Sequence, residues 1–175
     1  MPVPSSSTIP SLGAVVVLVG PSGCGKTVVG KELAAAINAR FLDADDFHTA
    51  EAKALMHSGH PLSDEQRHPW LERIRQAAIE ASARSTVILA CSALNPALRY
   101  DLKEDTPNWT FVALQVDADT LRERLSQRAG HFFPASMLDS QLAAWHPLEP
   151  GEGISVDGTQ AVEAIAEEIR QRLGL

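Results

Sequence analysis

The sequence contains little cysteine, no long hydrophobic run and no excess of positive charge. Two cysteines among 175 residues, Cys24 and Cys91, cannot form a disulfide framework, so we expect the reducing environment of the cytoplasm. The formal net charge is -7 at pH 7, whereas proteins that bind nucleic acids or membrane surfaces are usually basic. The apolar run 14–19 is far too short to span a bilayer. These absences predict a cytoplasmic protein without a nucleic-acid or membrane partner.

Residues 1–13 differ in composition from the rest of the chain. They are rich in serine and proline, carry no charged side chain, and lack the basic start and longer apolar stretch of a signal peptide. We therefore expect a flexible N-terminal extension over residues 1–13. Residues 14–175 have a length that fits one domain. Hydrophobic residues make up 45% of the chain, which is enough for a full core.

One motif in the chain carries a specific chemical prediction. Residues 20–27 read G-P-S-G-C-G-K-T and match the phosphate-binding P-loop pattern G-x-x-x-x-G-K-T. A β-branched run precedes the motif and apolar residues at helical spacing follow it, which is the strand–loop–helix context that a P-loop requires. Lys26 is expected to reach the β- and γ-phosphates of ATP, and the Thr27 hydroxyl to ligate Mg²⁺. The residues expected to bind the ATP phosphates are Gly20, Ser22, Gly23, Cys24, Gly25, Lys26 and Thr27.

Strand and helix patterns alternate along the chain, and no internal repeat is visible. This alternation is typical of an α/β domain with a mostly parallel sheet flanked by helices. The expected strands are 14–19, 41–42, 86–91, 110–116 and 153–156. The expected helices follow the P-loop as far as about residue 39, span 49–57 and 96–104, and follow Pro69, Asp117 and Thr159.

Two helix starts carry their own signals. Ser63 and Gln66 have the form of a capping box, but Pro69 follows closely. We therefore expect a turn over 63–67 and a helix that begins at Pro69, where a missing amide costs nothing. Thr159 is expected to cap the last helix.

Two carboxylates follow the second expected strand, at the edge of the sheet where open parallel sheets bind ligands. Asp43 and Asp45 occupy alternate positions and are expected to share one face of the strand end. Asp45 is our candidate to accept the proton of a substrate hydroxyl, and Asp43 to hold Mg²⁺ directly or through water. The alternative for both is helix capping in a solvated loop.

Two arginines precede the irregular segment 130–150. Arg124 and Arg128 lie one helical turn apart and are expected to share a helix face. Arginines at the base of a lid neutralise a transferring phosphoryl group and close on ATP. We expect both to be catalytic and a lid to span approximately 124–150. The alternative is a solvated helix face.

Several further strings, taken in order with the P-loop, resemble the gluconate kinase family. The resemblance runs from about Val15 to Val156. It implies an adenylate-kinase-like and shikimate-kinase-like P-loop NTPase fold with a mobile lid, ATP and Mg²⁺ as cofactors, phosphorylation of D-gluconate at O6, and commonly a homodimer. The matching strings are Phe41-Leu42-Asp43-x-Asp45 with His48, Gly59-x-Pro61-Leu62-x-Asp64-x-x-Arg67-x-Pro69-Trp70-Leu71, Cys91-Ser92-Ala93-Leu94 with Arg99, Arg128-x-Gly130-His131-Phe132, and Leu148-Glu149-Pro150.

The resemblance also implies a set of substrate-binding side chains. Arg99 is expected to bind the carboxylate of an aldonic acid through two parallel hydrogen bonds. Arg67 contacts substrate or only pairs with Asp64 to fix a turn, and the residues leave both open. The residues expected to bind the acceptor are Asp45, His48, Arg67, Arg99 and His131, and those expected to be catalytic are Lys26, Asp45, Arg124 and Arg128.

The chain departs from the family pattern at four positions, one of which is Leu98, where the family usually has a tyrosine before the arginine. The family usually has an asparagine and a lysine where this chain has Ala52 and Leu55, and a lysine where it has Asn95. These losses leave open a kinase for another sugar acid or polyol. Two further alternatives are a nucleotide-binding switch with slow hydrolysis and a kinase-like protein that only binds a partner. The absence of a guanine-specific N-K-x-D string disfavours the switch.

Overall fold

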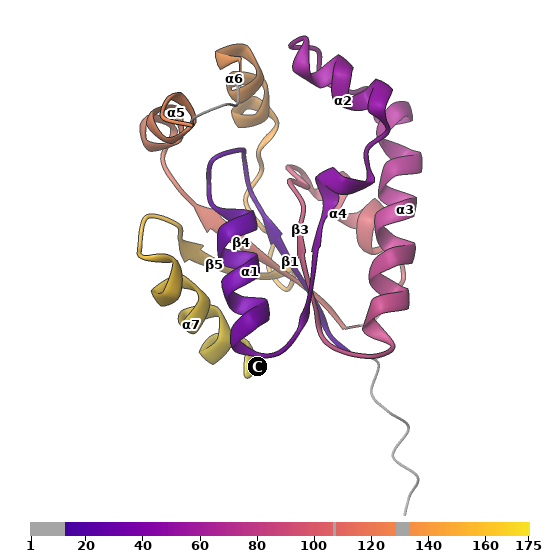
Figure 1. Cartoon of the computed structure of the whole chain (residues 1–175), viewed down its shortest axis with the longest axis vertical. Coiled ribbons are helices and arrows are strands. Elements are labelled where there is room, and N and C mark those ends of the chain that lie inside the picture. Colours follow the sequence, from indigo (N-terminus) through magenta and orange to yellow (C-terminus); the bar gives the residue numbers. More distant parts are fainter. Residues whose placement is uncertain (1–12, 107, 129–133) are drawn as a thin grey trace, which may run out of the picture.

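The computed structural model describes residues 13–106, 108–128 and 134–175, which form a five-stranded sheet with helices on both faces (Figure 1). The strand order is β2-β3-β1-β4-β5, and every neighbouring pair runs parallel. The predicted α/β class with a parallel sheet is therefore confirmed. The strands are β1 (Val15–Val19), β2 (Arg40–Asp43), β3 (Val87–Ala90), β4 (Trp109–Gln115) and β5 (Gly153–Asp157).

Helices cover both faces of the sheet. Figure 1 places α1 and α7 on one side and α3 and α4 on the other, while α2, α5 and α6 lie toward the upper end of the view. The helices are α1 (Lys26–Ala36), α2 (Ala50–His57), α3 (Asp64–Ser82), α4 (Pro96–Lys103), α5 (Ala118–Ser126), α6 (Ala135–Ala144) and α7 (Val162–Leu173), and a short 3₁₀ helix, η1 (Ala44–Phe47), precedes α2.

The central strand β1 is buried along its whole length because helices pack on both faces of the sheet. Side chains of a strand alternate between the two faces. The odd-numbered positions of β1 pack in one core cluster with Trp70 and Ile74 of α3, and the even-numbered positions pack in a second cluster with Leu33 of α1 and Ile169 of α7. A strand covered on both faces has no position that favours a polar residue, which explains the unbroken apolar run before the P-loop.

The long helix α3 shows that the expected turn over 63–67 and a helix beginning at Pro69 were wrong. α3 begins at Asp64 and contains Pro69. The Ser63 hydroxyl accepts a hydrogen bond from the Gln66 amide at 3.3 Å, and the Gln66 side chain accepts one from the Ser63 amide at 2.8 Å, which completes the capping box. Proline removes a single hydrogen bond of the helix ladder near its start, and the capping box together with the apolar face that follows outweighs that loss.

The last helix also begins later than expected. α7 starts at Val162 with Ala161 in the N-cap position, so Thr159 does not cap it. The Thr159 hydroxyl and amide instead donate to Asp157 Oδ1 at 2.6 and 2.9 Å. Thr159 therefore stabilises the turn that follows β5 and not the start of α7.

Two expectations extend to residues that the structure does not describe. Gly13 is fixed, because its amide donates to Ser82 O at 2.8 Å, but residues 1–12 of the expected extension lie outside the described residues. The expected lid over 124–150 contains α6, and 129–133 also lie outside. None of the helices in the described ranges has the length and apolar character that a membrane span requires.

Candidate active site

The expected ligand site lies where the parallel strands end. The P-loop follows β1, Asp43 closes β2, and Cys91 follows β3. In Figure 1 this edge faces upward, with α2 on one side and α6 on the other. The topology therefore brings the P-loop and the acidic end of β2 to the same rim, as the position of ligand sites in open parallel sheets predicts.

The P-loop backbone has the shape of an anion-binding loop. Gly23 and Gly25 adopt φ values of 88° and 105°, which side chains with a Cβ rarely adopt. A Cβ at Gly23 would also lie 3.2 Å from Leu125 Cγ of α5. Gly25 is the N-cap of α1, and no side chain in the described ranges caps that helix. The first amides of α1 are thus left for an anionic ligand.

Lys26 and Ser22 make contacts that bear on phosphate binding. Lys26 Nζ donates to Gly20 O at 2.8 Å and to Pro21 O at 3.0 Å, so its charge lies against the loop. The Ser22 amide donates to Gln141 Oε1 of α6 at 2.7 Å. Sequence reasoning missed Gln141, because 119 residues separate it from Ser22 and no local pattern marks it.

Thr27 and Asp43 are joined directly. Thr27 Oγ1 donates to Asp43 Oδ2 at 2.9 Å, and Asp43 Oδ1 accepts from the Asp45 amide at 3.0 Å, where it caps η1. A hydroxyl and a carboxylate are hard oxygen donors of the kind that Mg²⁺ prefers. A Mg²⁺ ion that also binds nucleotide phosphates and water needs only one or two protein oxygens. The residues present therefore fit this ion.

Asp45 lies on η1, so it does not share a strand face with Asp43 as the alternation argument assumed. Its side chain remains accessible at the surface, yet protein atoms surround much of the carboxyl group. This desolvation raises the pKa of Asp45 above its ordinary value, as does the charge of Asp43, while Lys26 opposes both. A carboxylate with a raised pKa is a better proton acceptor.

His48 stacks on Trp70, with ring centroids 4.1 Å apart and ring planes 11° from parallel. Trp70 is held in turn by a hydrogen bond from Nε1 to Ala44 O at 2.8 Å. Burial, and to a smaller extent the charges of Lys53, Arg73 and Arg67, together lower the pKa of His48 to about 4, so the ring is neutral at pH 7. His48 Nδ1 is buried, and it has no hydrogen-bond partner within the described part of the chain.

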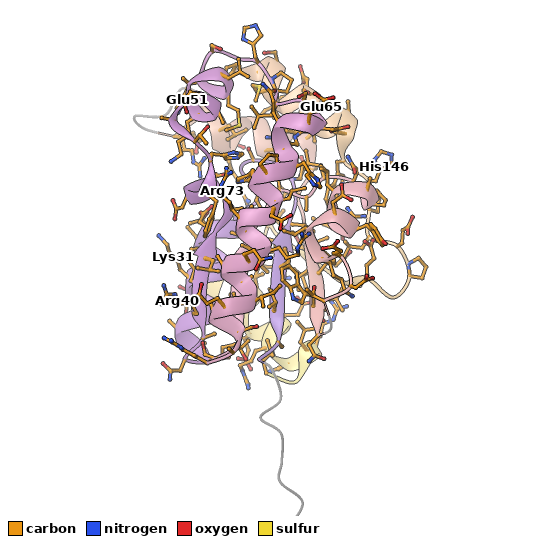
Figure 2. The ribbon with its side chains drawn as sticks, turned by 90° about the vertical axis from the view of Figure 1, so that its right-hand side faces the viewer. Lys31, Arg40, Glu51, Glu65, Arg73 and His146 are labelled. Carbon is orange, nitrogen blue, oxygen red and sulfur yellow. The ribbon has the colours of Figure 1, made fainter. Side chains whose placement is uncertain are left out.

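Three positively charged side chains act on the pKa of His48, and they differ in the hydrogen bonds that they make within the protein. Arg73 is used within the protein, since Nε and Nη2 donate to Phe47 O at 3.1 and 2.8 Å. Figure 2 shows Arg73 on α3, below the level of α2. Arg67 Nη1 lies 3.3 Å from Asp64 Oδ1 in a solvated pair, which holds the guanidinium only weakly.

Lys53, which the sequence analysis did not assign to the site, is the third cation that acts on His48. Its positive charge lowers the pKa of both Asp45 and His48, although the side chain is exposed on α2. The sequence could not show that Lys53 acts on these residues, because this depends on where α2 lies in the folded chain. Among the departures from the family pattern, Asn95 has a structural role: its Oδ1 accepts from the Leu98 amide at 3.0 Å and caps α4.

The expected role of Arg99 in substrate binding was wrong. Its side chain is fully buried, and all five of its N–H groups donate to protein oxygens. Nε and Nη2 form a bidentate pair with Glu152 at 2.9 and 3.0 Å. The other three donors bond to the carbonyls of Ala93, His146 and Pro147. No N–H group of Arg99 remains for a substrate carboxylate.

Arg124 and Arg128 do not share a helix face, because α5 ends at Ser126 and Arg128 lies beyond it. Arg124 Nη1 donates to Gly23 O at 3.1 Å and Nη2 donates to Gly158 O at 2.9 Å, so this arginine joins the P-loop to the turn after β5. Arg128 is exposed two residues beyond the end of α5. His131, the remaining expected site residue, lies outside the described residues.

The comparisons with known proteins agree with this geometry. The AAA domain family matches residues 15–148. A probable gluconokinase of Xenopus tropicalis is 38% identical over 172 residues, covering 89% of this chain and 90% of that protein.

Two solved structures resemble the chain over nearly its whole length. A sugar kinase from Janibacter sp. HTCC2649, solved without ligand, has a TM-score of 0.86 and 38% identity, covering 93% of this chain and 95% of that one. A gluconokinase from Sinorhizobium meliloti 1021 has a TM-score of 0.82 and 34% identity, covering 93% of both chains. With its P-loop, its parallel sheet and these relatives, the chain belongs to the gluconokinase family of P-loop kinases.

Proposed function

We propose that this protein transfers the γ-phosphoryl group of ATP to O6 of D-gluconate, giving ADP and 6-phospho-D-gluconate. The observation that carries the proposal is the chain of contacts from Thr27 through Asp43 to Asp45. It holds the phosphate-binding loop and the candidate proton acceptor in a fixed relation at one rim of the sheet. The names of the relatives favour gluconate over another acceptor and over a non-catalytic switch.

The phosphate side of the reaction needs charge neutralisation and positioning more than covalent chemistry. Thr27 and Asp43 would hold Mg²⁺, which supplies positive charge at the β- and γ-phosphate oxygens when it is bound. Lys26 adds a cation at the P-loop, and the first amides of α1 orient the phosphates. Arg128 is the exposed cation that we propose neutralises the transferring group. Arg124 is proposed to act through the P-loop, whose backbone it contacts.

Asp45 is the proposed proton acceptor. As the bond from O6 to the γ-phosphorus forms, the bond from that phosphorus to the bridging oxygen of ADP breaks, and the O6 proton passes to the Asp45 carboxylate. The raised pKa of Asp45 suits this step, because proton acceptance is more favourable when the acceptor pKa is closer to the working pH.

The acceptor is proposed to bind beside His48. We propose that a sugar hydroxyl bonds to Nδ1 of His48, a buried atom without a partner in the described part of the chain, and that the neutral ring avoids an additional charge there. Arg67 and Lys53 provide positive charge for the carboxylate of the sugar acid, a role for which Arg99 is not available. Lys53 thus offers a cation in the helix where the family lysine is replaced by Leu55.

Three finer features complete the proposal: dependence on Mg²⁺, a cytoplasmic location and a homodimer. The oxygen donors of Thr27 and Asp43 support the first. The free thiols of Cys24 and Cys91, both buried, are compatible with a reducing compartment. The resemblance to the family supports the homodimer, which light scattering of the purified protein tests directly.

The test is ADP production with MgATP and a panel of acceptors: D-gluconate, other aldonic acids, shikimate and none. We expect a strong response to D-gluconate, and Lys26→Ala should abolish most of it while the fold persists. A response to a different acid would keep the kinase and reassign the acceptor. ADP formation that does not depend on any acceptor would contradict the proposed function.

A further inference from the structure

The contact between Ser22 and Gln141 occupies an amide of the P-loop, the loop whose backbone N–H groups we expect to bind the ATP phosphates. The Ser22 amide donates to Gln141 Oε1 at 2.7 Å, which is short for an N–H···O bond, and the pair is partly buried. Two other loop amides are bonded to backbone, Gly20 N to Ser92 O and Cys24 N to Pro21 O. Ser22 is thus a loop amide whose partner is a side chain from a distant helix.

The position of Gln141 is set by the packing of α6. Leu138, one turn before Gln141, is buried in the same core cluster as Leu125 of α5. Leu125 in turn lies against the P-loop, within 3.2 Å of where a Cβ at Gly23 would be. An ion pair between Arg122 and Asp139 at 3.4 Å also joins the two helices. These contacts therefore fix the position from which the Gln141 side chain reaches the loop.

The chemistry of the contact resembles that of a bound phosphate. The carboxamide oxygen of glutamine is a neutral acceptor for an N–H group, and a phosphate oxygen would be a charged acceptor for the same group. One N–H group makes one well-aligned hydrogen bond, so Gln141 and a phosphate oxygen compete for Ser22. A bond to a charged acceptor is stronger than a bond to a neutral one, and the competition favours phosphate.

We propose that Gln141 is a positioning residue that stands in for a nucleotide phosphate: its Oε1 orients the Ser22 amide in the nucleotide-free protein and gives that amide up when a phosphate binds. The inference rests on the proposed function only in assuming that a nucleotide binds the P-loop. It assigns Gln141 a role at the loop. Because Gln141 belongs to α6, it also implies that the position of α6 depends on whether a nucleotide is bound.

The test compares MgADP binding to the wild-type protein and to Gln141→Met by calorimetry. Methionine keeps the length of the side chain and removes the acceptor oxygen. We expect MgADP to bind Gln141→Met about fivefold more tightly, because the free protein no longer makes a competing hydrogen bond worth about 1 kcal/mol. Ser140→Ala, an exposed neighbour on the same helix, is the matched control and should bind MgADP as the wild type does.

A second measurement separates competition from a general effect on the fold. The amide resonance of Ser22 in ¹⁵N-labelled protein should differ between wild type and Gln141→Met without nucleotide, and should coincide in the two MgADP complexes. Unchanged or weaker MgADP binding by Gln141→Met, or Ser22 resonances that still differ in the complexes, would overturn the proposal. If the wild type bound no MgADP, the proposed function itself would fail. Because the assay contains no acceptor, an error about gluconate does not affect it.

Discussion

Arg99, which is fully buried, and Glu152, which is partly exposed, form a bidentate ion pair with Nε–Oε1 and Nη2–Oε2 distances of 2.9 and 3.0 Å. The pair ties α4 to the segment that leads into β5. Burial opposes ionisation of Glu152, but the hydrogen bonds from Arg99 and from the Glu149 amide outweigh it and hold the pKa of Glu152 below its ordinary value.

We predict that breaking this pair destabilises the fold without altering acceptor recognition. Glu152→Gln should lower the free energy of unfolding by about 3 kcal/mol, because it leaves the buried charge of Arg99 without its counter-ion. The double variant Arg99→Met/Glu152→Met should recover part of that loss, since neither charge remains. Urea unfolding of the three proteins measures both effects.

Steady-state kinetics decide between the structural role and the substrate role of Arg99. In folded Arg99→Met, the KM for D-gluconate should stay within about twofold of the wild-type value, as for a residue that makes no contact with the acceptor. A large rise in that KM with an unchanged KM for ATP would restore Arg99 to the acceptor site.

The Thr27–Asp43 contact predicts how activity depends on magnesium. Asp43→Asn should lower turnover about 10–100-fold at limiting Mg²⁺, because the amide is a weaker ligand and a weaker partner for Thr27. Higher Mg²⁺ should restore part of the activity. Asp46→Asn, an exposed carboxylate on the same 3₁₀ helix, is the matched control and should leave the Mg²⁺ titration unchanged. Equal Mg²⁺ dependence of the two variants would contradict the assignment of Asp43.

Replacement of Asp45 should impair the chemical step more than nucleotide binding. Asp45→Asn should lower kcat by about 10²–10⁴-fold, the range for removal of a general base. Its affinity for MgADP, measured by calorimetry, should change little. A comparable loss of nucleotide affinity would indicate that Asp45 has a structural role.

The raised pKa of Asp45 also predicts a pH dependence. Activity needs the ionised carboxylate, so kcat should fall on acidification at a pH above the ordinary aspartate pKa of 3.8. The charge of Asp46 contributes to raising that pKa. Asp46→Asn should therefore shift the acidic limb of the kcat–pH profile to lower pH, and a shift to higher pH would contradict this electrostatic arrangement.

His48 predicts a loss of stability at mildly acidic pH. Its pKa is about 4 in the folded protein against 6.5 for the free side chain, so the unfolded chain binds an additional proton between these values. Stability should decrease by about 1–2 kcal/mol as the pH falls from 6.5 to 4, because solvent around the partly exposed ring screens part of the full linkage effect. His48→Phe keeps an aromatic ring against Trp70 without this titration. Urea unfolding at several pH values should show a smaller decrease for His48→Phe, and parallel curves would contradict the assignment.

Local patterns in the sequence were sufficient for most of the elements. The β-branched run before the P-loop, the glycines within it and the Asp117 cap of α5 each depend on neighbours a few residues away, and the structure confirms all three. The error at Pro69 arose because two local signals conflicted, and the packing of α3 favoured the capping box.

The roles of the arginines depended on residues far along the chain. Arg99 is bound by Glu152, 53 residues away, and Arg124 contacts Gly23, 101 residues away. In sequence, an arginine that binds a substrate carboxylate and one that binds a glutamate of the same chain look alike, because the guanidinium offers the same donors to both. The same holds for Gln141, whose partner is an amide with no sequence signature.

The sequence by itself determined the phosphate-binding loop, the parallel α/β sheet and the acidic end of β2, because each follows from short-range periodicity, glycine conformation and the order of strands. Only the tertiary structure decided which charged side chains remain available to a ligand. Burial and pairing settle that question, and both depend on groups that meet only when the chain has folded: Glu152 removes Arg99 from the acceptor site, while the folded chain brings the charge of Lys53 near enough to lower the pKa of both Asp45 and His48.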